Sequence, residues 1–473
     1  MTSAEVDLAV VGAGPAGMTA ATTAAAEGLD VVLLDEQPAG GGQIYRAVEA
    51  AAGPRGTLLG EDYVQGRHLT EALARSSARH VREAIVWKIE PDGAVAYSAA
   101  GRGRELRARF VVLAAGALER PMPIPGWTLP GVMTAGAAQI LLKQSGLVPA
   151  RAVLAGTGPL LYLLAQQLVR AGHPPAALVE TQTRADLAAA MPHLPAALAA
   201  PHYLAKGAAM LREIRRARVP RYTGATALRV EGERAAEGLS FRAGGRAHRL
   251  DAAHVLLHQG VVPNTQATRS LGLDHRWDAR QRCFVPVTDA WGRSSLETVY
   301  VVGDGAGITG AKAAEHAGCL AGLDAAFRLG RIDASARRAK SLGRRHALNR
   351  ERAPRAFLDT AYPPARATLA PADEVVVCRC EEVRAGDIRR WAALGCRGPN
   401  QTKAYGRAGM GPCQGRYCAL TVSEILAEAH GTTPAEVGTY RIRAPLKPIT
   451  LGELAGLADA DDPAAQPEKE TTS

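Results

Sequence analysis

The sequence predicts a mixed α/β fold in which two Rossmann-like dinucleotide-binding units precede a small, helical, cysteine-bearing module. Three observations predict this architecture. A glycine fingerprint, V-V-G-A-G-P-A-G-M, follows an apolar strand at residues 6–11. A second glycine turn, A-G-T-G-P-L-L, follows another apolar strand at residues 152–155. Two cysteine pairs, in C-R-C-E-E and G-P-C-Q-G-R-Y-C, lie near the C-terminal end and have the character of a cluster-binding pattern.

Composition limits the function classes. With 473 residues, of which 47% are hydrophobic, the chain can bury two or three cores. The formal net charge is +10, but the basic residues are dispersed and aromatic residues are only 4%, which argues against nucleic acid as a partner. No apolar run reaches the ~18 residues of a transmembrane helix, and no basic, cleavable leader is evident. We therefore expect a cytoplasmic protein without a transmembrane segment.

The first nucleotide unit consists of a strand at 6–11, a glycine turn, an alanine-rich helix, and a second strand at 31–34. Gly12 permits the tight turn, Gly14 lets backbone amides approach a pyrophosphate, and Gly17 lets the helix pack closely on the strand. The helix N-terminus would then face the anion.

An acid ends the second strand of this unit, as the fingerprint requires. Asp35 is expected to bind a ribose hydroxyl, and Glu36 follows it as a further cofactor contact.

Three later glycine turns favour FAD as the dinucleotide, because FAD proteins of this architecture return to the flavin with such turns. The first contains Gly42 and Gln43, the second ends a buried strand at Gly116, and the third contains Gly303 and Asp304. Asp304 is placed to bind ribityl or phosphate-linked hydroxyls, with a helix-capping role as the alternative.

The second nucleotide unit is less regular. Gly156 and Gly158 form its turn, but Leu161 stands where a small residue normally lets the helix sit close to its strand. Glu180, at the end of the next strand, would favour NAD over NADP because a carboxylate repels a 2′-phosphate. A working NAD site, a site for another adenine nucleotide, and an inherited scaffold all stay open.

The cysteine tetrad consists of Cys378, Cys380, Cys413 and Cys418. A C-x-C pair is awkward for closed zinc sites, which prefer two to four intervening residues, whereas iron–sulfur clusters tolerate it. A [2Fe-2S] cluster is the leading interpretation, with zinc and an empty site as alternatives. The groups expected to donate to the sulfurs or to offset the cluster charge are Gly406, Gly409, Gly411, Arg379, Lys403, Arg407 and Arg416.

Taken together, the ordered motifs resemble those of the two-dinucleotide-fold FAD/NAD(P)-dependent oxidoreductases of the glutathione/thioredoxin-reductase type. The motifs are G-A-G-P-A-G-M, G-G-Q-I-Y-R, L-A-A-G-A-L-E-R, P-G-W-T-L-P-G-V, A-G-T-G-P-L-L, H-Q-G-V-V-P-N-T and V-V-G-D-G-A-G-I. With the tetrad, they are similar more narrowly to the A or alpha subunits of opine oxidase, D-hydroxyproline dehydrogenase and archaeal proline dehydrogenase, and to the hydrogen cyanide synthase B subunit.

The resemblance implies a heteromeric amino-acid or opine dehydrogenase. A separate FAD-containing subunit would oxidise the substrate C–N bond, this chain would relay the electrons, and a small ferredoxin-like [2Fe-2S] subunit is a further candidate partner. The terminal module resembles the bacterioferritin-associated ferredoxin type of [2Fe-2S] domain, although the second cysteine pair of that type usually encloses two residues and here encloses Gln414–Tyr417.

The expected domains are an FAD domain at 1–125 and 265–330, an NAD(P)-binding-like domain at 126–264, a linker at 331–371, the cluster domain at 372–435, and a partly disordered tail at 436–473. No C-x-x-C motif suits a disulfide reductase, and no acid–base constellation identifies a catalytic residue. Two other functions compete with electron transfer within a complex: a stand-alone NAD(P)H-dependent reductase, and a scaffold with a zinc-stabilised docking module.

Overall fold

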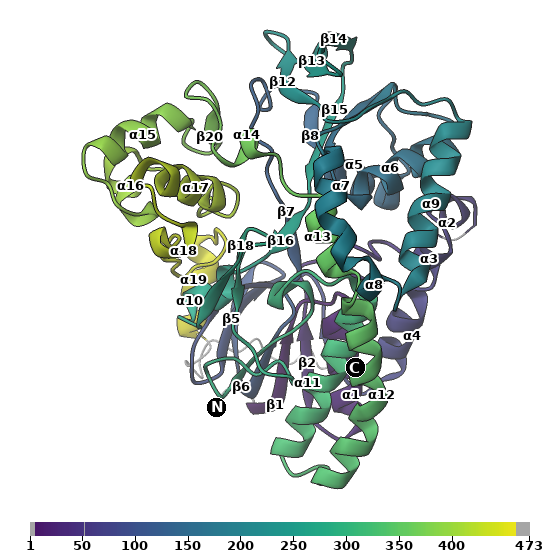
Figure 1. Cartoon of the computed structure of the whole chain (residues 1–473). Helices are drawn as coiled ribbons and strands as arrows, with labels where there is room; N and C mark the ends of the chain where they lie inside the picture. The colour runs from purple at the N-terminus through teal and green to yellow at the C-terminus, as the bar shows by residue number, and fades with distance from the viewer. Residues whose placement is uncertain (1–4, 52, 460–473) are drawn as a thin grey trace, which may run out of the picture.

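The computed structural model describes residues 5–51 and 53–459 (Figure 1). Its first nucleotide unit is a seven-stranded sheet in the order β3-β2-β1-β6-β5-β4, with β19 also paired to β6. The strands are β1 (Glu5–Val11), β2 (Val31–Leu34), β3 (Arg79–Val81), β4 (Ile85–Ile89), β5 (Ala94–Ala99), β6 (Arg102–Leu113) and β19 (Val299–Val301). The pairs around β1, β2, β3, β6 and β19 are parallel, whereas β4, β5 and β6 pair antiparallel.

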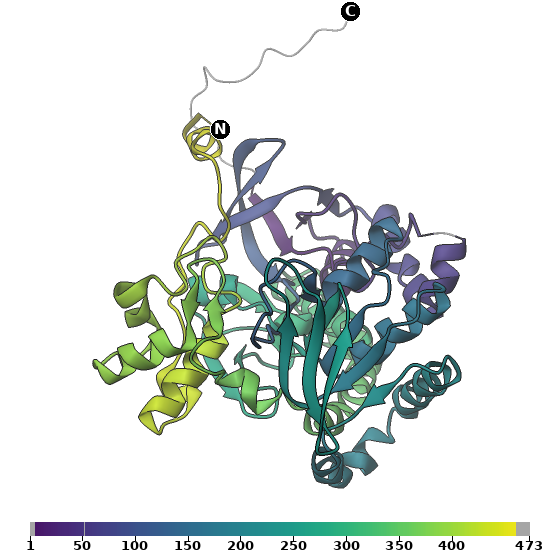
Figure 2. The same ribbon diagram turned by 90° about the horizontal axis from the view of Figure 1, so that it is seen from above.

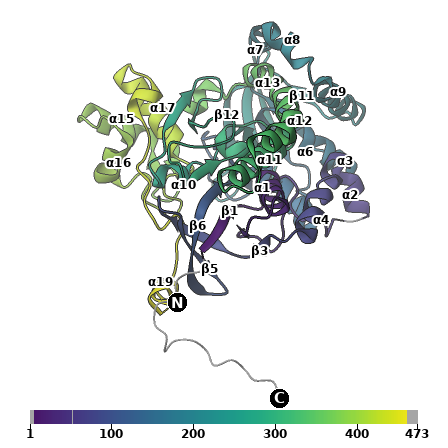
Figure 3. The same cartoon turned by 90° about the horizontal axis from the view of Figure 1, so that it is seen from below.

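Helices cover this sheet because the parallel strands are apolar on both faces. β2 is buried along its whole length, and the alanine-rich α1 (Pro15–Ala26) packs beside α11 (Ala311–Arg328). Glycine allows that close packing, since a Cβ at Gly318 would lie 2.1 Å from the Ala16 carbonyl oxygen. Figure 3 shows α1, α11 and α12 side by side.

The second nucleotide unit is a five-stranded parallel sheet in the order β11-β10-β9-β15-β8. Its strands are β8 (Val132–Thr134), β9 (Val153–Thr157), β10 (Ala177–Glu180), β11 (Arg221–Tyr222) and β15 (Val255–Gln259). A meander of β12 (Thr226–Glu231), β13 (Gly238–Ala243) and β14 (Arg246–Asp251) adjoins it. The two predicted Rossmann-like units are therefore confirmed, including their leading strands.

Two short strand pairs lie outside the main sheets. The pairs are β7 (Ala117–Glu119) with β16 (Val261–Pro263), and β17 (His275–Asp278) with β18 (Cys283–Pro286). The other helices up to residue 270 are α2 (Pro54–Leu59), α3 (Glu61–Val64), α4 (Arg67–Arg75), α5 (Ala135–Ser145), α6 (Pro159–Arg170), α7 (Arg184–Ala190), α8 (Leu194–Ala197), α9 (Pro201–Arg216) and α10 (Gln266–Ser270).

Residues 331–371, expected to be a linker, are instead largely helical. The segment forms α12 (Ala334–Arg352), α13 (Arg355–Ala361) and α14 (Arg366–Leu369). Asp333 caps α12 by accepting a hydrogen bond from Ala336 N at 2.7 Å. The basic run is partly packed rather than only solvated, because Arg337 donates to buried Asp324 at 2.7 Å and stacks 4.5 Å from the Trp291 ring.

The cysteine module is a small helical unit beside the first sheet (Figures 1 and 2). It contains β20 (Val376–Cys378), β21 (Val383–Arg384), α15 (Ala385–Ala393), α16 (Pro399–Gly406), α17 (Ala419–His430) and α18 (Pro434–Val437). The N-terminal end of α17 starts directly after Cys418.

The segment expected to be a partly disordered tail, 436–473, is described as far as residue 459, and we expected disorder only beyond Ala458. Tyr440 is 1% exposed, and α19 (Leu451–Asp459) packs on β6. A Cβ at Gly103 of β6 would lie 1.8 Å from the Glu453 carbonyl oxygen, so glycine is needed for this contact. Residues 460–473 lie outside the described residues. Among the described helices, none combines the length and apolar character needed to cross a bilayer.

Candidate functional site

The first glycine turn has the backbone geometry that its sequence predicts. Gly12 has φ +104°, and a Cβ there would lie 2.6 Å from the Ala114 carbonyl oxygen. A Cβ at Gly17 would lie 1.8 Å from the Gly12 carbonyl oxygen, so strand and helix meet without room for a side chain. Gly14 precedes α1, and its Cβ would meet only the Gly42 Cα, at 3.9 Å. The N-terminal end of α1 is therefore open to an anion.

The second glycine segment packs directly on this turn. Gly42 has φ +58°, and a Cβ there would lie 2.8 Å from the Gly14 Cα. Gln43 follows with an exposed side chain, and its backbone oxygen accepts a hydrogen bond from Lys143 Nζ at 3.0 Å. Two segments far apart in the chain thus form one edge of the nucleotide crevice.

Asp35 braces the glycine turn. Its Oδ2 accepts a hydrogen bond from Ala13 N at 2.5 Å, and its Oδ1 accepts one from Gln37 N at 2.8 Å. A carboxylate has further lone pairs, so a ribose hydroxyl can still donate to it. The neighbouring Glu36 is exposed and forms an ion pair with Lys447.

The other two glycine returns meet the same crevice, at the carboxyl ends of β6 and β19. Gly116 has φ +66° with open space around its Cβ position, and Gly303 has φ +67°. Asp304 Oδ1 accepts hydrogen bonds from Thr309 N at 2.8 Å and Gly310 N at 2.9 Å, as a capping residue does. Within the described part of the chain its Oδ2 has no hydrogen bond, so the ligand role that we predicted stays compatible with the cap.

Two buried basic side chains near the glycine turn were not predicted from the sequence. Arg46 is 9% exposed, and its Nε has no hydrogen-bond partner among the described residues. Lys143 is 3% exposed, and burial, followed by the Arg46 charge, lowers its pKa to about 7. Buried charges are normally paired, so this pair of cations suits an anionic ligand such as a pyrophosphate. The surroundings of the turn therefore fit FAD on three counts: close-packed glycines, an open helix terminus, and the buried basic side chains of Arg46 and Lys143.

The second glycine turn is also close-packed. Gly156 has φ +129°, and a Cβ there would lie 1.7 Å from the His258 carbonyl oxygen. A Cβ at Gly158 would lie 3.2 Å from His258 Nε2, while His258 Nδ1 lies 2.5 Å from Glu119 Oε1. This histidine–carboxylate pair beneath the turn was missed because its members lie in different motifs.

Glu180 does not have the geometry expected of a ribose ligand. It is 0% exposed, and Arg221 donates to both of its oxygens at 3.0 and 2.9 Å. Tyr162 and Gln182 also donate to Oε1. That Glu180 would favour NAD on meeting a ribose stays a prediction, and in this conformation a ribose would have to break the polar network around the carboxylate.

The cysteine tetrad forms two contacting pairs. Cys378, 1% exposed at the end of β20, is placed to accept a hydrogen bond from the Cys418 thiol, and the Cys380 thiol is placed to donate one to Cys413. The Cys418 bond, with backbone donors such as Gly409 N at 3.5 Å, lowers the pKa of Cys378 to about 6. Thiolate character of this kind is what a metal ligand requires.

The described residues do not form a closed metal shell. Within residues 5–51 and 53–459, no group of three or more His, Cys, Asp and Glu side chains is arranged to hold a metal ion. The structure thus brings the four predicted cysteines to one place, but as two pairs, and the cluster stays a prediction. Of the predicted charge-balancing groups, Arg416 donates to the Cys413 backbone oxygen at 3.1 Å, whereas Arg407 is paired with Glu381.

Tyr440 lies in the segment that we expected to be a tail, and it packs against residues 407–418, the cysteine loop between α16 and α17. A Cβ at either Gly409 or Gly415 would lie 2.5 Å from its ring, so the ring packs flush against this loop. Its hydroxyl lies 4.0 Å from Cys418 Sγ. The same segment reaches the first unit, where Leu446 N donates to the Trp87 backbone oxygen at 2.6 Å. The cysteine loop and β4, at the edge of the first sheet, are therefore joined by one strap, residues 440–447.

Comparisons with known proteins agree with this geometry. Residues 6–318 match the family model of pyridine nucleotide-disulphide oxidoreductases, and residues 374–457 match the model of the sarcosine oxidase A3 domain. The chain is 47% identical to the A subunit of opine oxidase from Agrobacterium tumefaciens (strain Ach5), over 95% of this chain and 92% of that protein. It is 32% identical to the HcnB subunit of hydrogen cyanide synthase from Pseudomonas aeruginosa, over 95% and 98%.

Among solved structures, L-proline dehydrogenase from P. horikoshii is similar with a TM-score of 0.69 at 20% identity, covering 95% of this chain and 79% of that one. This likeness shows the fold alone. The chain belongs to the pyridine nucleotide-disulphide oxidoreductases and, within them, to the family of opine oxidase A subunits. It is an FAD-dependent oxidoreductase with a Rossmann-like flavin-binding fold.

Proposed function

We propose that this chain is the electron-transferring subunit of a heteromeric dehydrogenase that oxidises the C–N bond of an opine or amino acid. The observation that carries the proposal is the 47% identity to an opine oxidase A subunit along nearly the whole of both chains. The substrate pocket would lie in a second FAD-containing subunit, with a small ferredoxin-like subunit as a further partner. The seven free cysteines suit a reducing compartment, so we place the complex in the cytoplasm.

FAD, when bound, supplies a carrier that accepts an electron pair and can release electrons singly. The chain's own residues would position it. The α1 N-terminus and the Gly14 amide would face the pyrophosphate, and Arg46 and Lys143 would balance its charge. Asp35 or Glu36 would receive a ribose hydroxyl, and Asp304 Oδ2 would receive a hydroxyl of the flavin chain.

A [2Fe-2S] cluster on Cys378, Cys380, Cys413 and Cys418 would complete the relay. Its support is the convergence of the four thiols, the low pKa of Cys378, and the backbone donor at Gly409. Against it stand the wide second cysteine pair and the match of this segment to a sarcosine oxidase domain. Iron analysis of the Cys378→Ser variant decides the matter: iron should be lost, while Cys396→Ser, a buried cysteine outside the tetrad, should keep it.

The division of labour is tested with the chain purified alone and with its co-expressed partner. The complex should reduce its flavins when an opine is added without oxygen, and the isolated chain should not. If the isolated chain oxidises the opine at the rate of the complex, the electron-transfer role is wrong.

The alternative, a stand-alone NAD(P)H-dependent reductase, draws on the intact turn at Gly156 and Gly158. The burial of Glu180 weighs against it. Fast flavin reduction by NADH in the isolated chain would reverse that preference.

A further inference from the structure

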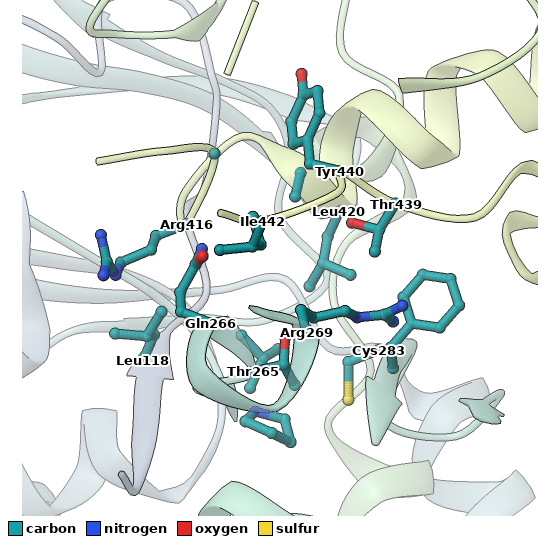
Figure 4. Close-up of a pocket in the computed structure, with 15 residues that line it drawn as sticks. Leu118, Thr265, Gln266, Arg269, Cys283, Arg416, Leu420, Thr439, Tyr440 and Ile442 are labelled. Atoms are coloured by element: carbon teal, nitrogen blue, oxygen red, sulfur yellow. The ribbon is translucent and has the colours of Figure 1, made fainter. Parts of the chain in front are cut away.

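A second cavity lies where the first nucleotide unit meets the cysteine module (Figure 4). The cavity itself has a volume of about 40 Å³, and the free space counted with the open solvent at its mouth is about 490 Å³. Leu118, Gln266 and Arg269 face it from one side, and Arg416 and Ile442 from the other. None of its lining residues is among those assigned above to FAD.

Arg269 is an unpaired cation in this cavity. Its Nε and Nη2 are shielded from solvent and have no hydrogen-bond partner among the described residues. The guanidinium stacks with its flat face 4.6 Å from the centre of the Phe284 ring. This contact gives its N–H groups no hydrogen-bond acceptor. Burial alone lowers the pKa of Arg269 to about 10, since no carboxylate compensates the charge. Nε and Nη2 form the edge of arginine that binds a carboxylate or phosphate with two parallel hydrogen bonds.

The remaining lining is apolar or neutral polar, with one further positive side chain. Arg416 contributes a second guanidinium, which bonds only to backbone oxygens, those of Cys413 and Leu446, among the described residues. None of the described side chains that line the cavity is an Asp or Glu. Gln266 is 8% exposed, and its Oε1 is also unpaired within the described ranges, so a ligand hydroxyl or amine has an acceptor there.

We propose that this cavity binds a small organic anion, a carboxylate or phosphate monoester with an apolar body, through the Nε and Nη2 edge of Arg269. The apolar body would lie against Leu118, Val262 and Ile442. Gln266 Nε2 already donates to the Gln414 backbone oxygen at 3.4 Å, so the ligand would sit at the contact between the flavin unit and the cysteine loop. The inference is independent of the substrate and partner proposed above.

The first test compares charge at constant shape in the full chain purified with its partner. Calorimetric titration uses benzoate and phenyl phosphate as the anions and benzamide as the neutral control. One or both anions should bind at least about tenfold more tightly than benzamide, the loss expected when a charged hydrogen-bond partner is missing. The tighter of the two identifies the anion class. Equal binding of all three, or no binding of either anion, overturns the proposal.

The second test locates the site. Arg269→Gln should weaken binding of the preferred anion by at least about tenfold, and Arg269→Lys, which keeps the charge but not the fork, should weaken it less. Arg242→Gln, at an exposed arginine of β13, is the matched control and should bind as the unmodified chain does. Circular dichroism of each variant checks folding. Anion binding unchanged in a folded Arg269→Gln chain refutes the site, and the benzamide comparison stands even if that variant does not fold.

Discussion

Gly14→Ala separates nucleotide binding from folding. Gly14 has φ −76° and ψ −178°, a conformation that alanine adopts freely, and its Cβ would meet only one atom within 4 Å. The fold should therefore keep its stability to within ~0.5 kcal/mol. The methyl group would project from the turn toward the open end of α1, where we place the FAD pyrophosphate. Losing one or two charge-assisted hydrogen bonds there costs about 1.5–3 kcal/mol, or roughly 10- to 150-fold in FAD affinity.

The assay is titration of the apoprotein with FAD, followed by quenching of flavin fluorescence, beside chemical denaturation of the same sample. Gly207→Ala, in the interior of α9 with nothing within 4 Å of its Cβ, is the matched control and should leave FAD affinity unchanged. Gly17→Ala, by contrast, should destabilise the fold itself, because the alanine Cβ would lie 1.8 Å from the Gly12 carbonyl oxygen. If Gly14→Ala binds FAD as tightly as Gly207→Ala does, the pyrophosphate does not lie on this turn.

Two further predictions concern stability. Asp324 is 0% exposed and accepts hydrogen bonds from Arg293 at 2.6 and 2.7 Å and from Arg337 at 2.7 Å, so Asp324→Asn should lower the free energy of unfolding by about 3–5 kcal/mol. Asp251→Asn, at an exposed ion pair, should change it by less than ~1 kcal/mol in the same denaturation series, and equal losses would contradict the buried network. The pKa of Lys143 is about 7 in the folded apoprotein and ~10.4 in an unfolded chain. Between pH 7 and pH ~10.4 the Lys143 amine is therefore protonated in the unfolded chain and neutral in the folded one. The free energy of unfolding of the apoprotein should therefore rise from about pH 7 to pH 10, and it should rise less in the Lys143→Met variant. If the free energy of unfolding changes with pH in the same way in both proteins, Lys143 is not buried as a neutral amine.

Local signals predicted the first unit well. Gly12, Gly14 and Gly17 are predictable from spacing because each acts on atoms within a few residues or on the adjacent strand. The same holds for Gly303, whose positive φ is a property of its own turn. Where two backbone segments approach closely, only glycine fits, so such a contact can be predicted from the glycine in the sequence.

Side-chain contacts between segments far apart in the sequence could not be predicted in this way. Glu180 is fixed by Arg221 of β11, and its sealing could not be anticipated from a turn motif alone. Lys143 and Arg46 belong to different segments, and their burial depends on how α5 packs on the glycine loop. The strand pattern placed Glu180 correctly at the end of β10 but could not say what would face it.

The packing of the segment at 331–371 and of the strap at 440–447 could not be predicted from the sequence for a related reason. The long charged side chains of α12 suggest a solvated face, yet Arg337 satisfies a buried aspartate and stacks on an aromatic ring. Tyr440 lies in a segment without helix or strand, and its packing depends on the three-dimensional fit to Gly409 and Gly415. Neither contact has a period or spacing that a sequence could reveal.

The proposed electron-transfer role requires that this chain hold both a flavin and a thiolate-bound cluster. The most direct measurement is the flavin, iron and acid-labile sulfide content of the chain purified with its partner without oxygen. We expect FAD to be released from this chain, together with about two iron and two sulfide ions per chain. A colourless chain, or one that holds zinc in place of iron and sulfide, would contradict the claim.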